Sequence, residues 1–113
     1  MRKTDKKIDN QLRLVLTDVC EIALKEINGF LWLTHLVNYS SFPKSLKMVC
    51  IFDTNESLTD FMSKDSNKDL EWLIQSQLAE IAVNLTKVTN HISYDTEENC
   101  AHQHNGKWAD RLG

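Results

Sequence analysis

An apolar stripe with helical spacing near the N-terminus most strongly constrains what this chain can fold into. Five apolar residues recur there at intervals of four or three positions: Ile8, Leu12, Val15, Val19 and Ile22. Because this spacing places all of them on one side of an α-helix, it predicts a core-facing helix over residues 5–28. Asn28 and Gly29 provide a helix end, since glycine adopts the left-handed backbone conformation without a steric penalty.

Two strand-like runs follow that helix. Residues 30–38 (FLWLTHLVN) and residues 46–53 (LKMVCIFD) are largely apolar, and a turn-forming segment that holds the only proline, Pro43, separates them. Proline removes a hydrogen-bond donor from a sheet, so Pro43 belongs in the connection. The pattern predicts a β-hairpin whose first strand is largely covered on both faces.

The second half of the chain predicts two more helices and one more strand. Residues 53–56 combine an N-cap with a carboxylate three positions later, and they begin a helix over residues 55–63. A second apolar stripe predicts a longer helix over residues 67–88, and residues 90–95 predict a short strand. Three strands cannot close a barrel. The order α-β-β-α-α-β therefore predicts an α+β two-layer sandwich, in which amphipathic helices cover a three-stranded sheet.

The length of 113 residues fits one domain, which we place at residues 1–95. Residues 96–113 are polar and offer only Trp108 and Leu112 as anchors, so we expect a tail that is disordered in part or that packs late. The charged N-terminus lacks the apolar segment of a secretory signal, and no apolar run is long enough to span a bilayer. These features favour a cytoplasmic protein, and an odd number of cysteines favours reduced thiols.

Charge is distributed unevenly along the chain. Residues 1–52 carry a formal net charge of +3 and residues 53–113 carry −6, which together give −3. Basic residues in the first helix and in the hairpin are candidates for contact with nucleic-acid phosphates: Arg2, Lys3, Lys6, Lys7, Lys44 and Lys47. Positive charge at the start of a helix opposes the helix dipole at a cost of about 0.3–1 kcal/mol, which indicates another use for it. The alternative is a solvated surface that only aids solubility.

The order of the elements resembles that of the KH-like domain of ribosome-binding factor A, over residues 5–98. The matching segments are residues 8–27, 30–38, 46–53, 55–88 and 91–95, and the last strand runs into an acidic stretch as in that family. The resemblance implies a non-enzymatic accessory module whose partner is RNA or a ribosomal particle. The three glycines form no Gly-x-x-Gly loop of the kind that clamps RNA in KH domains, so the basic residues would make the contact.

The chain also resembles short bacterial proteins that carry the label of Fis-like regulators. Fis-type proteins end in a helix-turn-helix that enters the major groove of DNA. Residues 98–113 lack both the apolar periodicity and the basic residues of a recognition helix. This second resemblance therefore adds no DNA-binding residues to the prediction.

Metal binding is an alternative function, and it rests on Cys100, His102 and His104. In an extended segment these alternate residues would share one face, and thiolate and imidazole are ligands that suit zinc, nickel or copper. The spacing matches no standard zinc module, so the competing interpretation is a polar tail that contains histidines by chance. On that interpretation no cofactor is expected.

A protein-interaction or homodimerisation module is the third possibility, and it rests on Trp72 and on the apolar run at residues 30–37. Trp72 lies beside the apolar stripe of its helix, so an exposed indole there would mark a partner interface. His35 and Cys50 lie in apolar runs, where we expect a hydrogen-bonded interior histidine and a buried thiol with a raised pKa. The motifs GxSxG, GxxxxGK[ST] and GxGxxG are all absent, so the chain is not expected to be an enzyme.

Overall fold

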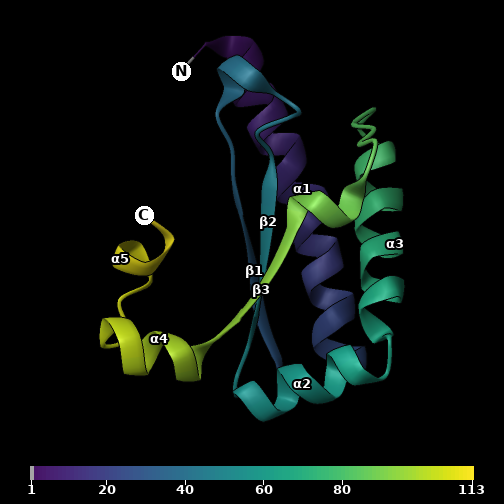
Figure 1. Cartoon of the computed structure of the whole chain (residues 1–113). Helices are drawn as coiled ribbons and strands as arrows, with labels where there is room; N and C mark the ends of the chain where they lie inside the picture. The colour runs from purple at the N-terminus through teal and green to yellow at the C-terminus, as the bar shows by residue number, and fades with distance from the viewer. Residues whose placement is uncertain (1) are drawn as a thin grey trace.

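The computed structural model describes residues 2–113 and confirms an α+β fold with a three-stranded sheet. The elements are α1 (Lys3–Glu26), β1 (Phe30–Leu36), η1 (Tyr39–Ser41), β2 (Lys47–Phe52), α2 (Asn55–Ser63), α3 (Ser66–Ala79), η2 (Val88–His91), β3 (Ile92–Thr96), α4 (Glu97–His104) and α5 (Trp108–Leu112). The predicted order of helices and strands is present, and α4 and α5 follow it. α1 and α3 lie on one side of the sheet, and α4 and α5 lie on the other (Figure 1).

The first apolar stripe forms the buried face of α1. Leu12, Val15 and Val19 are buried in the core, as their spacing predicts. Gly29 follows the helix in the left-handed region with φ +83°, and a Cβ atom at this position would lie 2.5 Å from the Cβ atom of Ser57. Both the backbone conformation and the close approach of α2 therefore require glycine. Although α1 has 24 residues, neither it nor any other helix in the described part of the chain is apolar enough to cross a membrane.

β2 is the central strand, and its neighbours are β1 on one side and β3 on the other. β1 runs antiparallel to β2, which confirms the hairpin, whereas β3 runs parallel to β2 and is reached through α2 and α3. Met48, Cys50 and Phe52 belong to the core that α1 and α3 share. Val49 and Ile51 are also buried and point to the opposite face, since side chains alternate along a strand. Burial raises the pKa of the Cys50 thiol to about 12, as expected.

The prediction that the first strand is covered on both faces is wrong. β1 lies at an edge of the sheet, and two of its apolar residues, Leu31 and Leu36, are exposed. The strand with both faces buried is β2. Apolar composition alone does not distinguish a central strand from an edge strand, because a partly covered edge strand also carries apolar side chains.

α3 is shorter than predicted, because it ends at Ala79 and not at residue 88. Ala82 has a left-handed backbone with φ +61°, and its N–H donates to the carbonyl of Ala79 at 3.0 Å. The N–H of Val83 donates to the carbonyl of Leu78, also at 3.0 Å. These two bonds form the Schellman motif, which glycine usually completes. Leu85 and Val88 follow this point and are buried, although they lie outside the helix. Because their positions continue the helical spacing of the apolar stripe, the predicted helix was too long.

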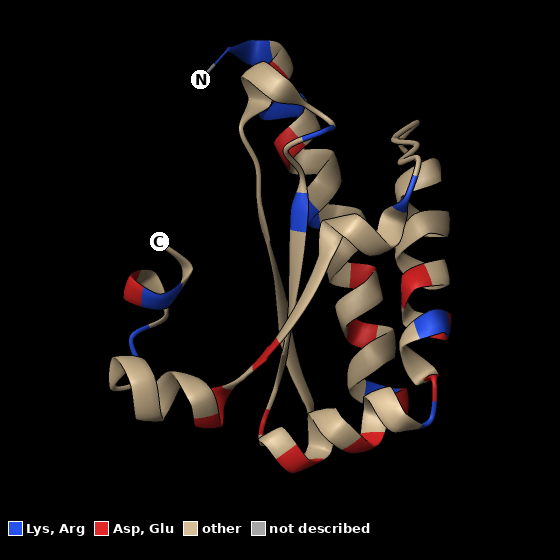
Figure 2. Ribbon diagram, in the orientation of Figure 1, with Lys and Arg blue, Asp and Glu red and all other residues tan. Residues whose placement is uncertain are grey.

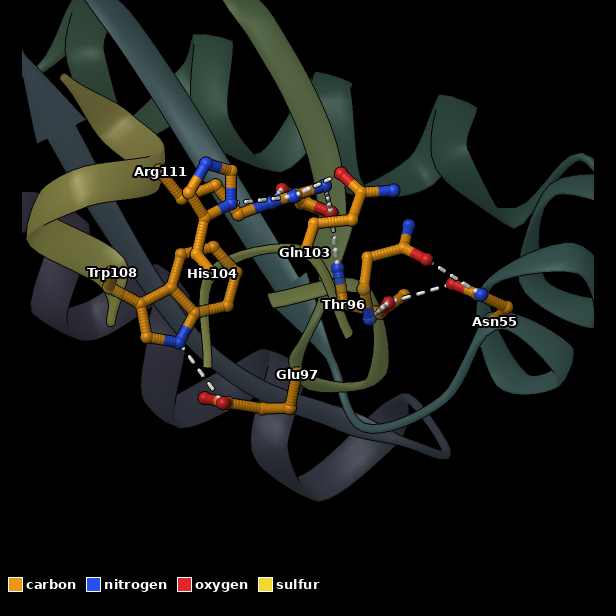
Figure 3. Close-up of polar contacts among 9 residues, drawn as sticks. Asn55, Thr96, Glu97, Gln103, His104, Trp108 and Arg111 are labelled. Carbon is orange, nitrogen blue, oxygen red and sulfur yellow. Dashed lines mark hydrogen bonds and ion pairs between the residues drawn. The ribbon is translucent and has the colours of Figure 1, made fainter. Parts of the chain in front are cut away.

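The expected polar tail, residues 96–113, is instead two helices that pack on the sheet. Glu97 of α4 accepts a hydrogen bond from Trp32 Nε1 at 2.9 Å and another from Trp108 Nε1 at 3.0 Å. Figure 3 shows the second of these bonds. The two indole rings meet edge to face with 5.0 Å between their centroids. One carboxylate and one aromatic pair thus join the C-terminal helices to β1.

Further polar contacts join the C-terminal helices to β3 and α2. Thr96 caps α4 by accepting a hydrogen bond from the N–H of Asn99 at 3.0 Å, and its hydroxyl donates to Asn55 Oδ1 at 2.7 Å (Figure 3). Arg111 of α5 forms an ion pair with Asp95 of β3, with 3.0 Å between Nη2 and Oδ1. Burial acts to raise the pKa of Asp95, but the hydrogen bonds from Arg111 and from the backbone of Thr96 hold it below its usual value.

Replacing Arg111 by alanine is expected to lower the free energy of unfolding by about 1–3 kcal/mol, because the partly buried Asp95 carboxylate loses its charged partner. Urea denaturation followed by circular dichroism measures this difference. Lys64→Ala is the control. It removes an ion pair with Asp60 in which both side chains are exposed, by 65% and 56%, and such exposed pairs contribute about 0–1 kcal/mol. Equal losses of stability in the two variants would show that Arg111 does not anchor the C-terminal helices.

Candidate nucleic-acid interface

The structure brings the predicted basic residues to one end of the molecule. The first turns of α1 and the connection between β1 and β2 lie side by side there, at the end opposite α2 (Figure 1). Figure 2 shows that basic residues of both segments gather at this end. All six predicted residues have exposed side chains: Arg2, Lys3, Lys6, Lys7, Lys44 and Lys47. Two segments that are distant in sequence therefore contribute to one surface.

Asp9 of α1 holds the β1–β2 connection against the helix. Its Oδ1 atom accepts a hydrogen bond from the hydroxyl of Tyr39 at 2.5 Å and lies 3.4 Å from His35 Nε2, while its Oδ2 atom accepts from Arg13 Nε at 2.8 Å. The bond from Tyr39 holds the pKa of Asp9 below its usual value, although burial acts in the opposite direction. Burial and the same bond raise the pKa of Tyr39 to about 12. His35 is partly buried and faces a polar partner, as predicted.

Short-range hydrogen bonds fix the shape of the β1–β2 connection. Asn38 caps η1 by accepting a hydrogen bond from the N–H of Ser40 at 3.0 Å. The hydroxyl of Ser45 donates to the carbonyl of Asn38 at 2.7 Å and accepts from its N–H at 2.9 Å. Lys44 therefore lies in a connection whose two ends, at Asn38 and Ser45, are hydrogen-bonded to each other.

Lys87 is a basic residue of this surface that the sequence did not reveal. A hollow of about 280 Å³ separates the β1–β2 connection from the segment before η2, and its lining includes Lys44 and Lys87. His91 lies beside it and donates from Nδ1 to the carbonyl of Leu46 at 2.7 Å, which joins the two segments. Lys87 was missed because it was assigned to the predicted helix over residues 67–88. We use the term basic end for seven residues: Arg2, Lys3, Lys6, Lys7, Lys44, Lys47 and Lys87.

The lysines of the basic end are available to an external anion. Within residues 2–113 none of them forms a salt bridge, and only Arg2 of this set pairs with a carboxylate, that of Asp5 at 3.4 Å. The N-cap residue of α1 makes no side-chain capping bond. The first backbone N–H groups of a helix and the helix dipole attract phosphate. Charge and helix geometry at this end therefore favour the same kind of ligand.

The structure does not support the extended geometry on which the metal-binding prediction rested. Cys100, His102 and His104 lie on α4, where residues two apart point to different sides of the helix. Cys100 is fully buried, His102 is exposed, and His104 Nδ1 lies 3.2 Å from the guanidinium of Arg111. Burial raises the pKa of the Cys100 thiol. In the part of the chain that the structure describes, no three His, Cys, Asp or Glu side chains are placed to hold a metal ion.

The side chain of Trp72 is exposed. The sequence analysis predicted that an exposed indole at this position would mark a partner interface. Its exposed fraction is 69%, the second highest among the exposed large apolar residues. By contrast, Glu71 beside it is buried and accepts hydrogen bonds from Thr89 at 2.8 Å and from the hydroxyl of Tyr94 at 3.0 Å. The role of Trp72 in a partner interface or in a homodimer stays a prediction.

Comparison with known proteins does not assign the chain to a family. No family model matches the sequence, no curated protein matches it, and no solved structure matches the fold. The functional argument therefore rests on the residues and their arrangement.

Asp9→Asn is expected to lower the free energy of unfolding at pH 7 by about 1–2 kcal/mol, because an amide accepts the bond from Tyr39 less strongly than a carboxylate. The lowered pKa of Asp9 means that its stabilisation is complete above its unfolded pKa, about 3.9, and is lost as pH falls through the folded value. Denaturation at a series of pH values should show the two proteins converging in acid. Asp18→Asn, an exposed carboxylate of α1, is the control and should leave stability unchanged at every pH.

Proposed function

We propose that this chain is a non-enzymatic accessory module that contacts RNA through the basic end, with a ribosomal particle as its partner. The observation that carries the proposal is the convergence of three separate segments on one exposed basic surface: the start of α1, the β1–β2 connection and the segment before η2. Positive side chains that converge in this way neutralise phosphates and release their counterions. The proposal also draws on the resemblance of the element order to the KH-like domain of ribosome-binding factor A.

The chemistry of the basic end favours contact with phosphates over contact with bases. Base recognition in RNA uses exposed aromatic rings on which unstacked bases lie. The nearby aromatic residues are engaged within the protein, since Tyr39 donates to Asp9 and its ring centroid lies 6.1 Å from that of Phe42. The contact that we propose therefore depends on charge and not on RNA sequence.

The net charge of −3 does not oppose a local contact of this kind. Charges in physiological salt are screened over about 8 Å, whereas the longest axis of the molecule is 40 Å. Asp5 and Asp9 lie in the first turns of α1, where each pairs with an arginine. Other acidic residues gather on α2, α3 and the last turns of α1, away from the basic end (Figure 2). RNA at the basic end would be largely screened from them, and RNA that approached the acidic residues would be repelled.

Replacing Lys6, Lys7, Lys44 and Lys47 by glutamate is expected to weaken RNA binding at least about tenfold, because charges that neutralise phosphates give way to charges that repel them. Fluorescence anisotropy with a labelled fragment of ribosomal RNA measures the affinity, and co-sedimentation with ribosomal particles at low and moderate salt tests the partner. For the wild type, the logarithm of the binding constant should fall linearly with that of the salt concentration. Glutamine at the same positions should make this slope shallower by about 0.7 for each phosphate that the protein no longer neutralises.

The control variant carries the same change in charge at exposed lysines outside the basic end: Lys25, Lys64, Lys68 and Lys107. It is expected to bind RNA nearly as tightly as the wild type. If it weakens binding as much as the first variant does, only net charge matters, and the basic end has no special role. Unchanged binding in the first variant would remove the proposed surface altogether.

A further inference from the structure

A groove lies at the other end of α1, between its last turns, the end of α2 and the start of α3. Its volume is about 550 Å³, which lies within the range of protein binding sites. Apolar side chains from all three helices and the residue after α1 line it: Ile22, Ala23, Ile27, Phe61, Leu70 and Leu73. Ala23, Phe61 and Leu70 are buried, whereas Ile22, Ile27 and Leu73 are only partly covered. The groove is thus lined by apolar side chains that are continuous with the core.

Trp72 lies at this groove and does not belong to the core of its own chain. Its neighbours in the helix, Leu70 and Ile74, are buried, but Trp72 itself is 69% exposed. A large exposed indole beside an apolar groove is the kind of residue that contributes most to binding at protein interfaces. The favourable free energy of removing the indole from water is gained only when another molecule occupies the groove.

The charged residues of the groove set the charge of its occupant. Its lining includes three carboxylates, those of Glu26, Asp60 and Asp69, and one basic residue, Lys64. Lys64 is already paired with Asp60, at 3.0 Å between Nζ and Oδ2. Within residues 2–113, Glu26 and Asp69 form no salt bridge. The surplus of negative charge disfavours RNA and anionic lipid and favours a cationic partner.

The walls of the groove also restrict the backbone of its occupant. The lining comes from helices, the turn after α1 and the connection between α2 and α3, and no strand contributes to it. An extended peptide bound there would find no sheet edge with which to pair its backbone N–H and C=O groups. A helix satisfies these groups internally, and it can place apolar side chains in the groove while its basic side chains reach the rim.

We propose that the groove binds a basic amphipathic helix of a partner protein, with Trp72 as the main apolar contact and Glu26 and Asp69 as the acidic contacts. The inference rests on residues at the opposite end of the molecule from the basic end. It therefore holds or fails independently of RNA binding.

The test uses the full chain and a synthetic peptide of about 14 residues, four turns of helix, made of leucine and lysine at helical spacing. Calorimetry is expected to detect binding, and NMR chemical-shift changes are expected to map to the lining of the groove. Trp72→Ala should weaken binding at least about tenfold. Asp69→Lys should weaken it and reduce its salt dependence. Leu14→Ala is the control. It removes a residue of α1 that is 70% exposed and lies outside the groove, so the affinity should not change.

Three results would overturn the proposal. A peptide with glutamate in place of each lysine could bind equally well, which would show that the acidic residues do not select a cation. Trp72→Ala could bind the lysine peptide with wild-type affinity while its NMR spectrum shows an intact fold. Light scattering could reveal a dimer that Trp72→Ala converts to a monomer, which would assign the groove to a second copy of the chain.

Discussion

The burial of β2 on both faces is the constraint on which the rest of the structure depends. In a three-stranded sheet the central strand has a neighbour on each side, but both of its faces are open to water unless other elements cover them. Residues 48–52 are all buried and apolar, so cover is needed on both faces. α1 and α3 lie on one side, and α4 and α5 lie on the other (Figure 1). The C-terminal segment is therefore an integral part of the fold.

The sequence predicts those features of the fold that depend on the spacing or clustering of apolar residues along the chain. The stripe that begins at Ile8 defines α1, and two apolar runs around Pro43 define the hairpin. The Schellman motif at Ala82 escaped prediction because alanine is a rare residue for its left-handed position. The C-terminal helices escaped for a different reason. These helices are held by Glu97, whose carboxylate accepts hydrogen bonds from two indoles, and by Arg111, which pairs with Asp95. Hydrogen bonds between residues that are distant in the sequence produce no periodic pattern in it.

The candidate surfaces were predictable to the extent that exposed charge and exposed aromatic residues are visible in a sequence. Six members of the basic end were identified because lysines and arginines seldom have a place in a core. Their gathering at one end depends on the contact between Asp9 and Tyr39, thirty positions apart, which no local pattern indicates. Trp72 was recognised by its place beside the apolar stripe. The groove next to it is made by three helices together, so it exists only in the folded chain.

The position of the two proposed surfaces on one helix has a consequence for how they would work together. Lys7 of the basic end and Ile22 of the groove are separated by about 22 Å along α1, at 1.5 Å per residue. This distance is well beyond the screening length of about 8 Å in physiological salt, so charge at one surface has little influence on the other. A basic helix and an RNA attract each other strongly when both are free. On this chain each would meet a proposed surface of opposite charge, and the distance between the two surfaces would keep the helix and the RNA apart.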